Sequence, residues 1–539
     1  MAREKIDGNL ILSYETEKYR EIYWTALSNY IIGKYKKKEF TEHSKVESIL
    51  LESFQYLIDE FKKLISEETT TSFFNYVFFL HEQSCKFLIK TRAGLPFGKI
   101  DEKDFSRYRR ILKLILEQGC DIDLTWGKFP TSQEVYRMDD KIQRLFYLGT
   151  WFYTFADYIA YQKMIPNGQK INFNEENYIG VYWQKHYETS YNELFSRLNI
   201  DYEKATFDKN AVKELKEAIN ECFGINYDFA GGLIFEMKKH FSKSEFQTIE
   251  PYVLPINLST QFKIDKETAE SFYNGISISR ENKQSIENVV YKPYSTGRYM
   301  YRPILIYKID GTERALVGEE KFKESMYVLS INAISWNTIP IEWKKNRCML
   351  KYMSRKGNEH DSILEDEIEE ILKNRNLRFV RNIKSFKRPN TNNINIDNEL
   401  AGEIDFIIID SFRKRLIVAD SKYNKAKYEA VGYRTDNTNF IDRYEPKLKK
   451  KIDWVYDNKQ IVQDHFQIIY NLDKLDISDY KVIGLFFINT PTFYMFNGQY
   501  KAITLNHLDS YLSNDYEEFK IKYKNEEGVE ELIYHPYFK

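Results

Sequence analysis

The chain has 539 residues, 42% hydrophobic and 16% aromatic, enough for two or three domains with large apolar cores. Its formal net charge of −1 excludes a global positive field, so a nucleic-acid partner would have to be held by local basic patches. Without a long apolar run or a signal-peptide core at the N-terminus, the sequence predicts a cytoplasmic protein with no membrane partner.

Residues 1–250 have the spacing of a mainly α-helical region. Apolar residues recur every three or four positions in three segments, 48–67, 107–118 and 141–164. The aromatic residues between Phe146 and Phe155 are expected in a packed helical core, with a base-stacking platform as the alternative. We expect this region to act as a sensing, regulatory or scaffold part of the protein.

Residues 251–350 show a different pattern, typical of a small α+β segment. An alternating stretch at 299–322 turns at Asp310-Gly311, which predicts a β-hairpin. The segment 325–335 is expected to add another strand. We interpret 251–350 as a linking segment whose function the sequence does not indicate.

Residues 351–539 alternate between helical and strand patterns, which predicts an α/β domain with a mixed sheet flanked by helices. The expected helices cover 361–374 and 446–467, the expected strands cover 403–410, 415–422 and 480–489, and 500–514 adds a short strand and a helix.

The segment EIDFIIIDSFRKRLIVADSKYN predicts the register of a β-hairpin. If residues 411–414 form a four-residue loop, Asp405 lies directly opposite Asp420, with Cβ atoms about 4.5–5.5 Å apart. The two-residue period of a strand places Lys422 on the same face. One register therefore gathers two carboxylates and an amine at the end of an apolar hairpin.

Two buried carboxylates this close repel each other unless a cation lies between them. Carboxylate oxygens suit a hard divalent ion, Mg²⁺ with Mn²⁺ as a substitute. Such an ion polarises a phosphoryl oxygen and activates water, and a lysine can orient that water or stabilise negative charge. The alternative is a pair of hydrated strand-end aspartates with Lys422 as their salt-bridge partner.

The order Glu365…Asp405…Asp420-Ser421-Lys422 resembles the PD-(D/E)XK nuclease superfamily, which has the restriction-endonuclease-like fold, and is most similar to its Mrr-type branch. The resemblance covers roughly residues 355–515. It implies Mg²⁺-dependent cleavage, with Asp405 and Asp420 as metal ligands and Lys422 as the catalytic lysine. Ile404 stands where the motif has proline.

The resemblance also implies that an acid on the first helix supplements the metal site, and Glu365 occupies the matching position. Glu367 is a second possibility on that helix. The alternative for Glu365 is a capping box, because Ser362 and Glu365 fit the S-x-x-E pattern of a helix start.

Basic residues flank the hairpin on both sides in the sequence. Downstream, Lys447 and Lys451 lie one helical turn apart and could hold a phosphate, with an exposed lysine face as the alternative. Upstream, a cluster fits a phosphate-gripping edge, with a solvated loop as the alternative. The residues of this cluster predicted to bind nucleic acid are Arg378, Arg381, Lys384, Lys387 and Arg388.

The chain contains no P-loop and no HExxH motif, and its four cysteines form no CxxC pair. We expect these cysteines to be reduced, without a disulfide framework or structural zinc. The hypothesis is a Mg²⁺-dependent endodeoxyribonuclease. Through the family resemblance, we expect a role in restriction or anti-phage defence, with a helper or ATPase subunit or a second copy of the chain as further partners. The alternatives are a degenerate nucleic-acid-binding or scaffolding protein, and a nuclease that cleaves RNA.

Overall fold

The fold was analysed in a computed structural model of the chain. The structure describes residues 3–12, 17–92, 94–98, 100–128, 130–165, 167–184, 210–241, 247–389, 391–397, 401–427, 429–513, 515, 520–524 and 529–534. Two compact units are present. The first comprises Met1–Ile159, Ile171–Val181 and Thr206–Gly357, and the second comprises Ala160–Lys170, Tyr182–Ala205 and Asn358–Lys539.

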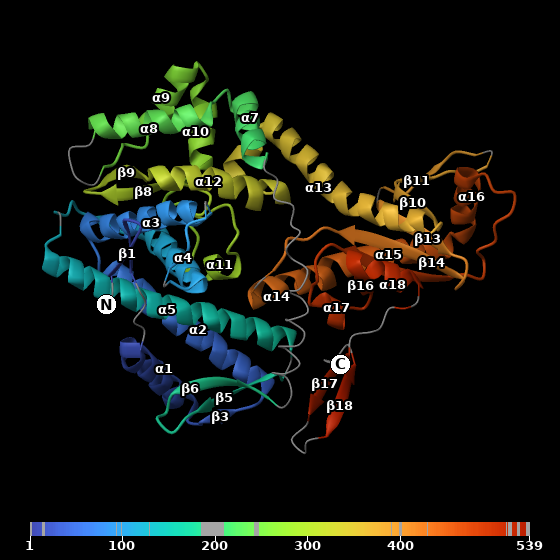
Figure 1. Cartoon of the computed structure of the whole chain (residues 1–539), viewed down its shortest axis with the longest axis horizontal. Coiled ribbons are helices and arrows are strands. Elements are labelled where there is room, and N and C mark those ends of the chain that lie inside the picture. Colours follow the sequence, from blue (N-terminus) through green and yellow to red (C-terminus); the bar gives the residue numbers. More distant parts are fainter. Residues whose placement is uncertain are drawn as a thin grey trace. The chain divides into compact units, whose positions relative to one another are not determined.

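The first unit is mainly helical (Figure 1). Its helices are α1 (Arg20–Tyr35), α2 (His43–Ser66), α3 (Thr71–Arg92), α4 (Glu102–Gly119), most of α5 (Ser132–Met164), α7 (Ala211–Phe223), α8 (Tyr227–Phe241), α9 (Val253–Phe262), α10 (Lys266–Gly275), α11 (Ile286–Tyr291) and α12 (Glu319–Asn332). The three predicted N-terminal helices lie within α2, α4 and α5. Phe146, Phe152 and Phe155 of α5 are fully buried, which confirms the prediction of a packed core.

Short strands complete this part of the chain. They are β1 (Arg3–Ile6) paired with β2 (Asn9–Leu12), β3 (Glu39–Phe40) with β5 (Gln169–Phe173) and β6 (Ile179–Trp183), and a sheet of β4 (Asp123–Leu124), β7 (Ser277–Ile278), β8 (Ile304–Ile309) and β9 (Thr312–Val317). The predicted hairpin is β8–β9. Asp310 and Gly311 form its turn with φ of 46° and 78°, the left-handed backbone that a two-residue hairpin turn requires.

Two predictions for this unit are wrong. Residues 325–335 begin inside α12 instead of forming a strand, because Phe322, Met326 and Leu329 recur at helical spacing and fill the core. The four cysteines are not all reduced, because Cys222 and Cys348 form a disulfide across 126 residues of sequence. Residues 251–350 belong to the same compact unit as most of the N-terminal residues.

The second unit contains a five-stranded mixed sheet in the order β10-β13-β14-β15-β16. The strands are β10 (Arg378–Ile383), β13 (Ile404–Asp410), β14 (Arg415–Lys422), β15 (Lys481–Ile488) and β16 (Lys501–Thr504). The first three pair antiparallel, and β14, β15 and β16 are parallel. Two separate hairpins are β11 (Ser385–Phe386) with β12 (Ile394–Asn395), and β17 (Lys520–Lys524) with β18 (Glu530–Tyr534).

Helices pack on both faces of this sheet (Figure 1). They are α13 (Arg347–Asn374), α14 (Ala430–Asn439) with a π-helical turn at Phe440–Tyr444, α15 (Glu445–Asp457), α16 (Lys459–Tyr470), the short α17 (Tyr494–Asn497) and α18 (Leu505–Ser513). Apolar residues of α15 and α16 cover one face, and those of α13 and α18 cover the other. Successive strand residues such as Ile407 and Ile408 alternate between the two cores, which explains why these strands are apolar throughout.

The mixed sheet flanked by helices agrees with the coarse architecture predicted for the C-terminal third. Helix α13 begins fourteen residues before the predicted helix start and crosses the boundary between the two units. The predicted helix at 446–467 is divided by Asn458 into α15 and α16. In the described parts of the chain, no helix is long and apolar enough to cross a membrane.

Candidate active site at the end of the β13–β14 hairpin

The register of β13 and β14 agrees with the one derived from the sequence. Asp410 pairs with Arg415 and Phe406 pairs with Ala419, which places Asp405 opposite Asp420. Lys422 ends β14, and its Nζ lies 3.4 Å from Asp420 Oδ2 and 3.9 Å from Asp405 Oδ2. The hairpin thus brings together the three side chains on which the nuclease hypothesis depends.

Helix α15, which packs on one face of the sheet, contributes a second ammonium group to this cluster. Lys451 lies in the stripe of α15 that faces the sheet, between the buried residues Leu448 and Val455. Its Nζ lies 2.5 Å from Asp420 Oδ1 and 3.8 Å from Asp405 Oδ1, and 9% of its side chain is exposed. Lys447, predicted together with Lys451, is exposed.

Glu365 reaches the same cluster from α13. Its Oε1 accepts a hydrogen bond of 3.3 Å from the Ser421 hydroxyl, which also donates to Asp405 Oδ2 at 3.0 Å. The capping-box alternative is wrong, because α13 begins at Arg347 and the Ser362 hydroxyl bonds to the Glu359 carbonyl inside the helix. The Ser421 hydroxyl therefore links the carboxylates of Glu365 and Asp405.

Burial and neighbouring charges shift the pKa values of these carboxylates in opposite directions. Burial and the nearby Asp420 raise the pKa of Asp405. Burial alone would raise the pKa of Asp420 as well, but the ammonium groups of Lys422 and Lys451 outweigh it and lower this pKa. Burial also raises the pKa of Glu365. Such perturbed carboxylates beside charged partners are typical of functional sites.

Three residues in contact with this cluster were not predicted from the sequence. The Ser421 main-chain N–H donates to Asp405 Oδ2 at 2.7 Å, and Asn382 Nδ2 donates to Glu365 Oε2 at 3.0 Å. Asn382 has a left-handed φ of 52° within β10, an uncommon conformation inside a strand. The Tyr444 ring, at the end of the π-helical turn, lies 5.4 Å from Lys422 Nζ. Serine and tyrosine carry no spacing signal, and only the order of strands places Asn382 beside Asp405.

The basic residues predicted to grip phosphate are not equivalent in the structure. Arg381 makes ion pairs with three acids of α13, Glu365, Asp366 and Glu369. Lys384 Nζ lies 3.4 Å from the Glu403 carboxylate. The remaining members are exposed, namely Arg378, Lys387 and Arg388. The exposed residues, more than Arg381, therefore keep basic groups available to a ligand.

The donor set at the hairpin end fits a hard divalent cation. Asp405 and Asp420 offer carboxylate oxygens, and Glu365 lies one hydroxyl group away. The ammonium group of Lys451 lies between Asp405 Oδ1 and Asp420 Oδ1, the position where a shared cation would neutralise both. A divalent ion held by both aspartates would therefore have to displace this ammonium group.

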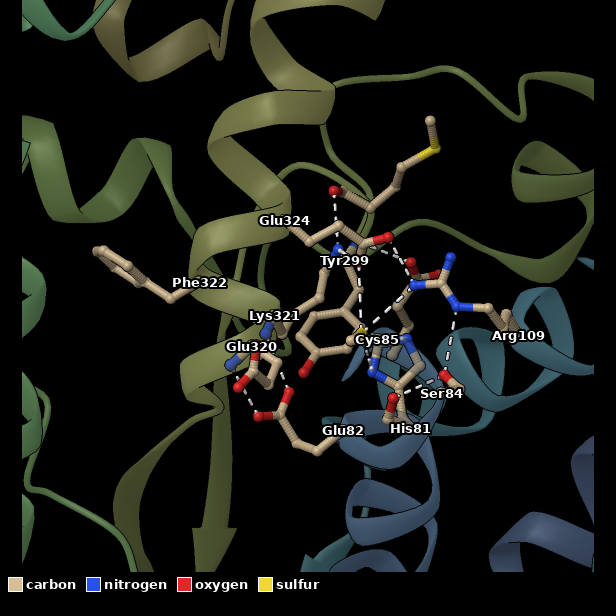
Figure 2. A network of polar contacts seen from close by, with 12 residues as sticks. His81, Glu82, Ser84, Cys85, Arg109, Tyr299, Glu320, Lys321, Phe322 and Glu324 are labelled. Carbon is tan, nitrogen blue, oxygen red and sulfur yellow. Dashed lines mark hydrogen bonds and ion pairs between the residues drawn. The ribbon is translucent and has the colours of Figure 1, made fainter. Parts of the chain in front are cut away.

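A second polar cluster lies in the core of the first unit (Figure 2). His81, Glu82 and Cys85 place potential ligand atoms within 4.8 Å of one another. Arg109 Nη2 lies 3.3 Å from Cys85 Sγ and also pairs with Glu324. Glu82 accepts the first N–H groups of α12.

The surroundings of this cluster do not favour a metal. Burial raises the pKa of the Cys85 thiol to about 12, and it raises that of Glu82 to about 7. Arg109 and Lys321 add two positive charges next to the same atoms. We interpret the cluster as a buried ion-pair network that joins α3, α4 and α12.

Comparisons with known proteins add no relative, because no family model, no curated protein and no solved structure matches the chain.

Proposed function

We propose that the chain is a metal-dependent nuclease that hydrolyses phosphodiester bonds of DNA with a PD-(D/E)XK-like C-terminal domain. The observation that carries the proposal is the convergence of Asp405, Asp420, Lys422 and Lys451 at the end of one buried hairpin. Together with Glu365, five ionisable groups gather there, and perturbed carboxylates beside charged partners are typical of functional sites. Unlike the ion-pair network of the first unit, this cluster is partly exposed, with 21% of the Lys422 side chain and 17% of the Asp405 side chain accessible.

Asp405, Asp420 and Glu365 would hold Mg²⁺ or Mn²⁺. When bound, this ion supplies Lewis-acid polarisation of the scissile phosphate and lowers the pKa of water. Lys422 would orient the attacking water and stabilise the negative charge that develops on the phosphoryl oxygens. A bond forms between the water oxygen and phosphorus, and the bond from phosphorus to the leaving sugar oxygen breaks. The attacking water gives up one proton to solvent, and the leaving oxygen takes one from solvent.

Lys451 would have two positions in this proposal. In the first, its ammonium group lies 2.5 Å from Asp420 Oδ1 and neutralises the aspartate pair. With the ion bound, the released ammonium group is free to contact a phosphate oxygen of the substrate. The first unit would then control or recruit the nuclease, in restriction or anti-phage defence.

The experiment is digestion of plasmid DNA by the full chain with Mg²⁺ and with chelator. We expect Asp420→Asn and Lys422→Ala to lose at least a hundredfold in rate, because removing one charge-stabilising group commonly costs that much. Lys451→Ala should also be slower, and Lys450→Ala, at an exposed position of the same helix, is the matched control. Parallel digests of RNA test the alternative substrate. Undiminished cleavage by Asp420→Asn or Lys422→Ala would contradict the proposal.

A further inference from the structure

The open edge of the sheet borders a groove that leads away from the carboxylate cluster. Strand β10 is an edge strand, and the groove beside it has a volume of about 860 Å³. Its lining comes from the end of α13, from β10 and from α16, including His465, Ile469 and Tyr470. All of the lining residues belong to the second unit.

On the groove side of β10, side chains provide hydrogen-bond partners for only some of the main-chain N–H and C=O groups. The Tyr470 hydroxyl accepts from the Phe379 N–H at 2.9 Å and donates to the Phe379 carbonyl at 2.6 Å. Both polar groups of Phe379 therefore point away from β13. By the two-residue alternation of a strand, the main chain of Arg381 faces the same groove. The groove consequently offers main-chain donors and acceptors to a ligand that lies along β10.

The charge of the groove differs from that of the whole chain. Its lining contains four basic residues and one acid, Glu369, a formal balance of +3 in a protein of net charge −1. The basic residues are Lys373, Arg378, Arg381 and Lys384, of which Lys373 and Arg381 pair with acids of α13 and Lys384 lies 3.4 Å from the Glu403 carboxylate. Such a balance favours a polyanion, since a chain of phosphates gains from several basic contacts in a row.

The groove adjoins the proposed active site. Arg381 and Asn382 line it, and both also contact Glu365 Oε2, at 3.4 Å and 3.0 Å. These two residues therefore connect the site to the groove. The groove volume is within the range of about 300–1,000 Å³ for pockets that take small ligands, which is room for a few nucleotides of one strand.

We propose that the groove along β10 binds a single-stranded segment of the nucleic-acid substrate next to the scissile phosphate. This inference rests on the proposed nuclease function and adds the form of the substrate to it. The phosphates of the strand would contact Arg378 and Lys384, and a base would lie against the partly exposed Tyr470 ring. Stacking of this kind tolerates any base, so the groove would select a strand end or unpaired region instead of a sequence.

The test measures binding alone, so its failure can be told apart from a failure of the nuclease proposal. A fluorescently labelled eight-nucleotide DNA strand and a blunt duplex of the same length are titrated with the full chain in chelator, where metal-dependent cleavage does not proceed. The variants are Arg378→Glu/Lys384→Glu in the groove and Lys450→Glu/Lys481→Glu on exposed sites outside it. Fluorescence anisotropy gives the dissociation constants at several salt concentrations.

We expect the groove variant to bind the single strand at least tenfold more weakly and the control variant to bind it like the wild type. The slope of log K against log salt should become shallower by about 0.7 for each lost phosphate contact. Equal affinity of the groove variant and the wild type would overturn the proposal. The proposal would also be overturned if the duplex bound as tightly as the single strand and with the same salt dependence. A labelled poly-glutamate peptide that binds through Arg378 and Lys384, while the DNA strand does not bind, would overturn it as well.

Discussion

Replacing Lys451 by methionine tests how the carboxylate cluster is neutralised. The substitution keeps the length and apolar stem of the side chain and removes the ammonium group 2.5 Å from Asp420 Oδ1 and 3.8 Å from Asp405 Oδ1. Lys422 then remains as the only ammonium group that the described contacts place within 4 Å of both carboxylates. One of the two buried carboxylates then lacks most of the positive charge that balances it.

The expected cost is about 3 kcal/mol of unfolding free energy, the lower end of the ~3–5 kcal/mol for breaking a buried ion pair, because Lys422 still contacts Asp420. A divalent ion should restore this loss, since it supplies charge at the same position. Saturation at a hundred times the dissociation constant contributes about 2.7 kcal/mol. Mn²⁺ should therefore stabilise Lys451→Met more than it stabilises the wild type, whose ammonium group must first be displaced.

Hydrogen exchange followed by mass spectrometry suits a chain of two units, because it reports the opening free energy of β13 and β14 by themselves. Lys447→Met, with its side chain on the exposed side of α15, is the matched control and should behave like the wild type in chelator and in Mn²⁺. The reasoning is refuted if Lys451→Met leaves the protection of β13 and β14 unchanged in chelator, or if Mn²⁺ protects the wild type and the variant equally.

Three further substitutions test other parts of the structure. Glu324→Gln should lower the unfolding free energy of the first unit by about 3–5 kcal/mol, because it leaves two buried cations without their shared carboxylate, as chemical denaturation would show. Burial lowers the pKa of His465 to about 4, so its stabilising effect is present above pH 6.5 and is lost as the pH falls toward 4. After allowance for solvent screening, the loss of this stabilising effect amounts to about 2 kcal/mol. His465→Asn, which keeps a hydrogen-bond acceptor, should remove that pH dependence from urea unfolding curves. Cys222→Ser should cost about 2–4 kcal/mol, and peptide mapping without reductant should find Cys222 linked to Cys348 in the wild type.

The hairpin register could be predicted from the sequence because a loop of four residues and strands apolar on both faces leave one consistent pairing. Counting outward from Asp410 and Arg415 was sufficient to place Asp405 opposite Asp420. The inward direction of Lys451 was harder to predict from the sequence. A lysine within an apolar stripe has the same sequence spacing as an exposed lysine one turn away. Its buried position follows from how α15 packs on the sheet.

Other features depend on packing between distant segments, which leaves no local pattern. The start of α13 at Arg347 was missed because Met349, Tyr352 and Met353 bury against the first unit's core and extend the helix beyond its amphipathic part. The disulfide joins cysteines 126 residues apart. Asn382 reaches Glu365 because β10 lies beside β13, and this neighbour relation is a property of the sheet and not of any motif.

Titration calorimetry with Mn²⁺ tests the central claim most directly, because the proposed chemistry requires Asp405 and Asp420 to hold a divalent ion. The wild type should bind Mn²⁺ with measurable heat, and Asp405→Asn and Asp420→Asn should each abolish that binding. As the matched control, Asp410→Asn changes the buried carboxylate at the other end of the same hairpin, where Arg413 and Arg415 are its partners, and should leave Mn²⁺ binding intact. No Mn²⁺ binding by the wild type, or equal binding by Asp405→Asn and Asp420→Asn, would contradict the account.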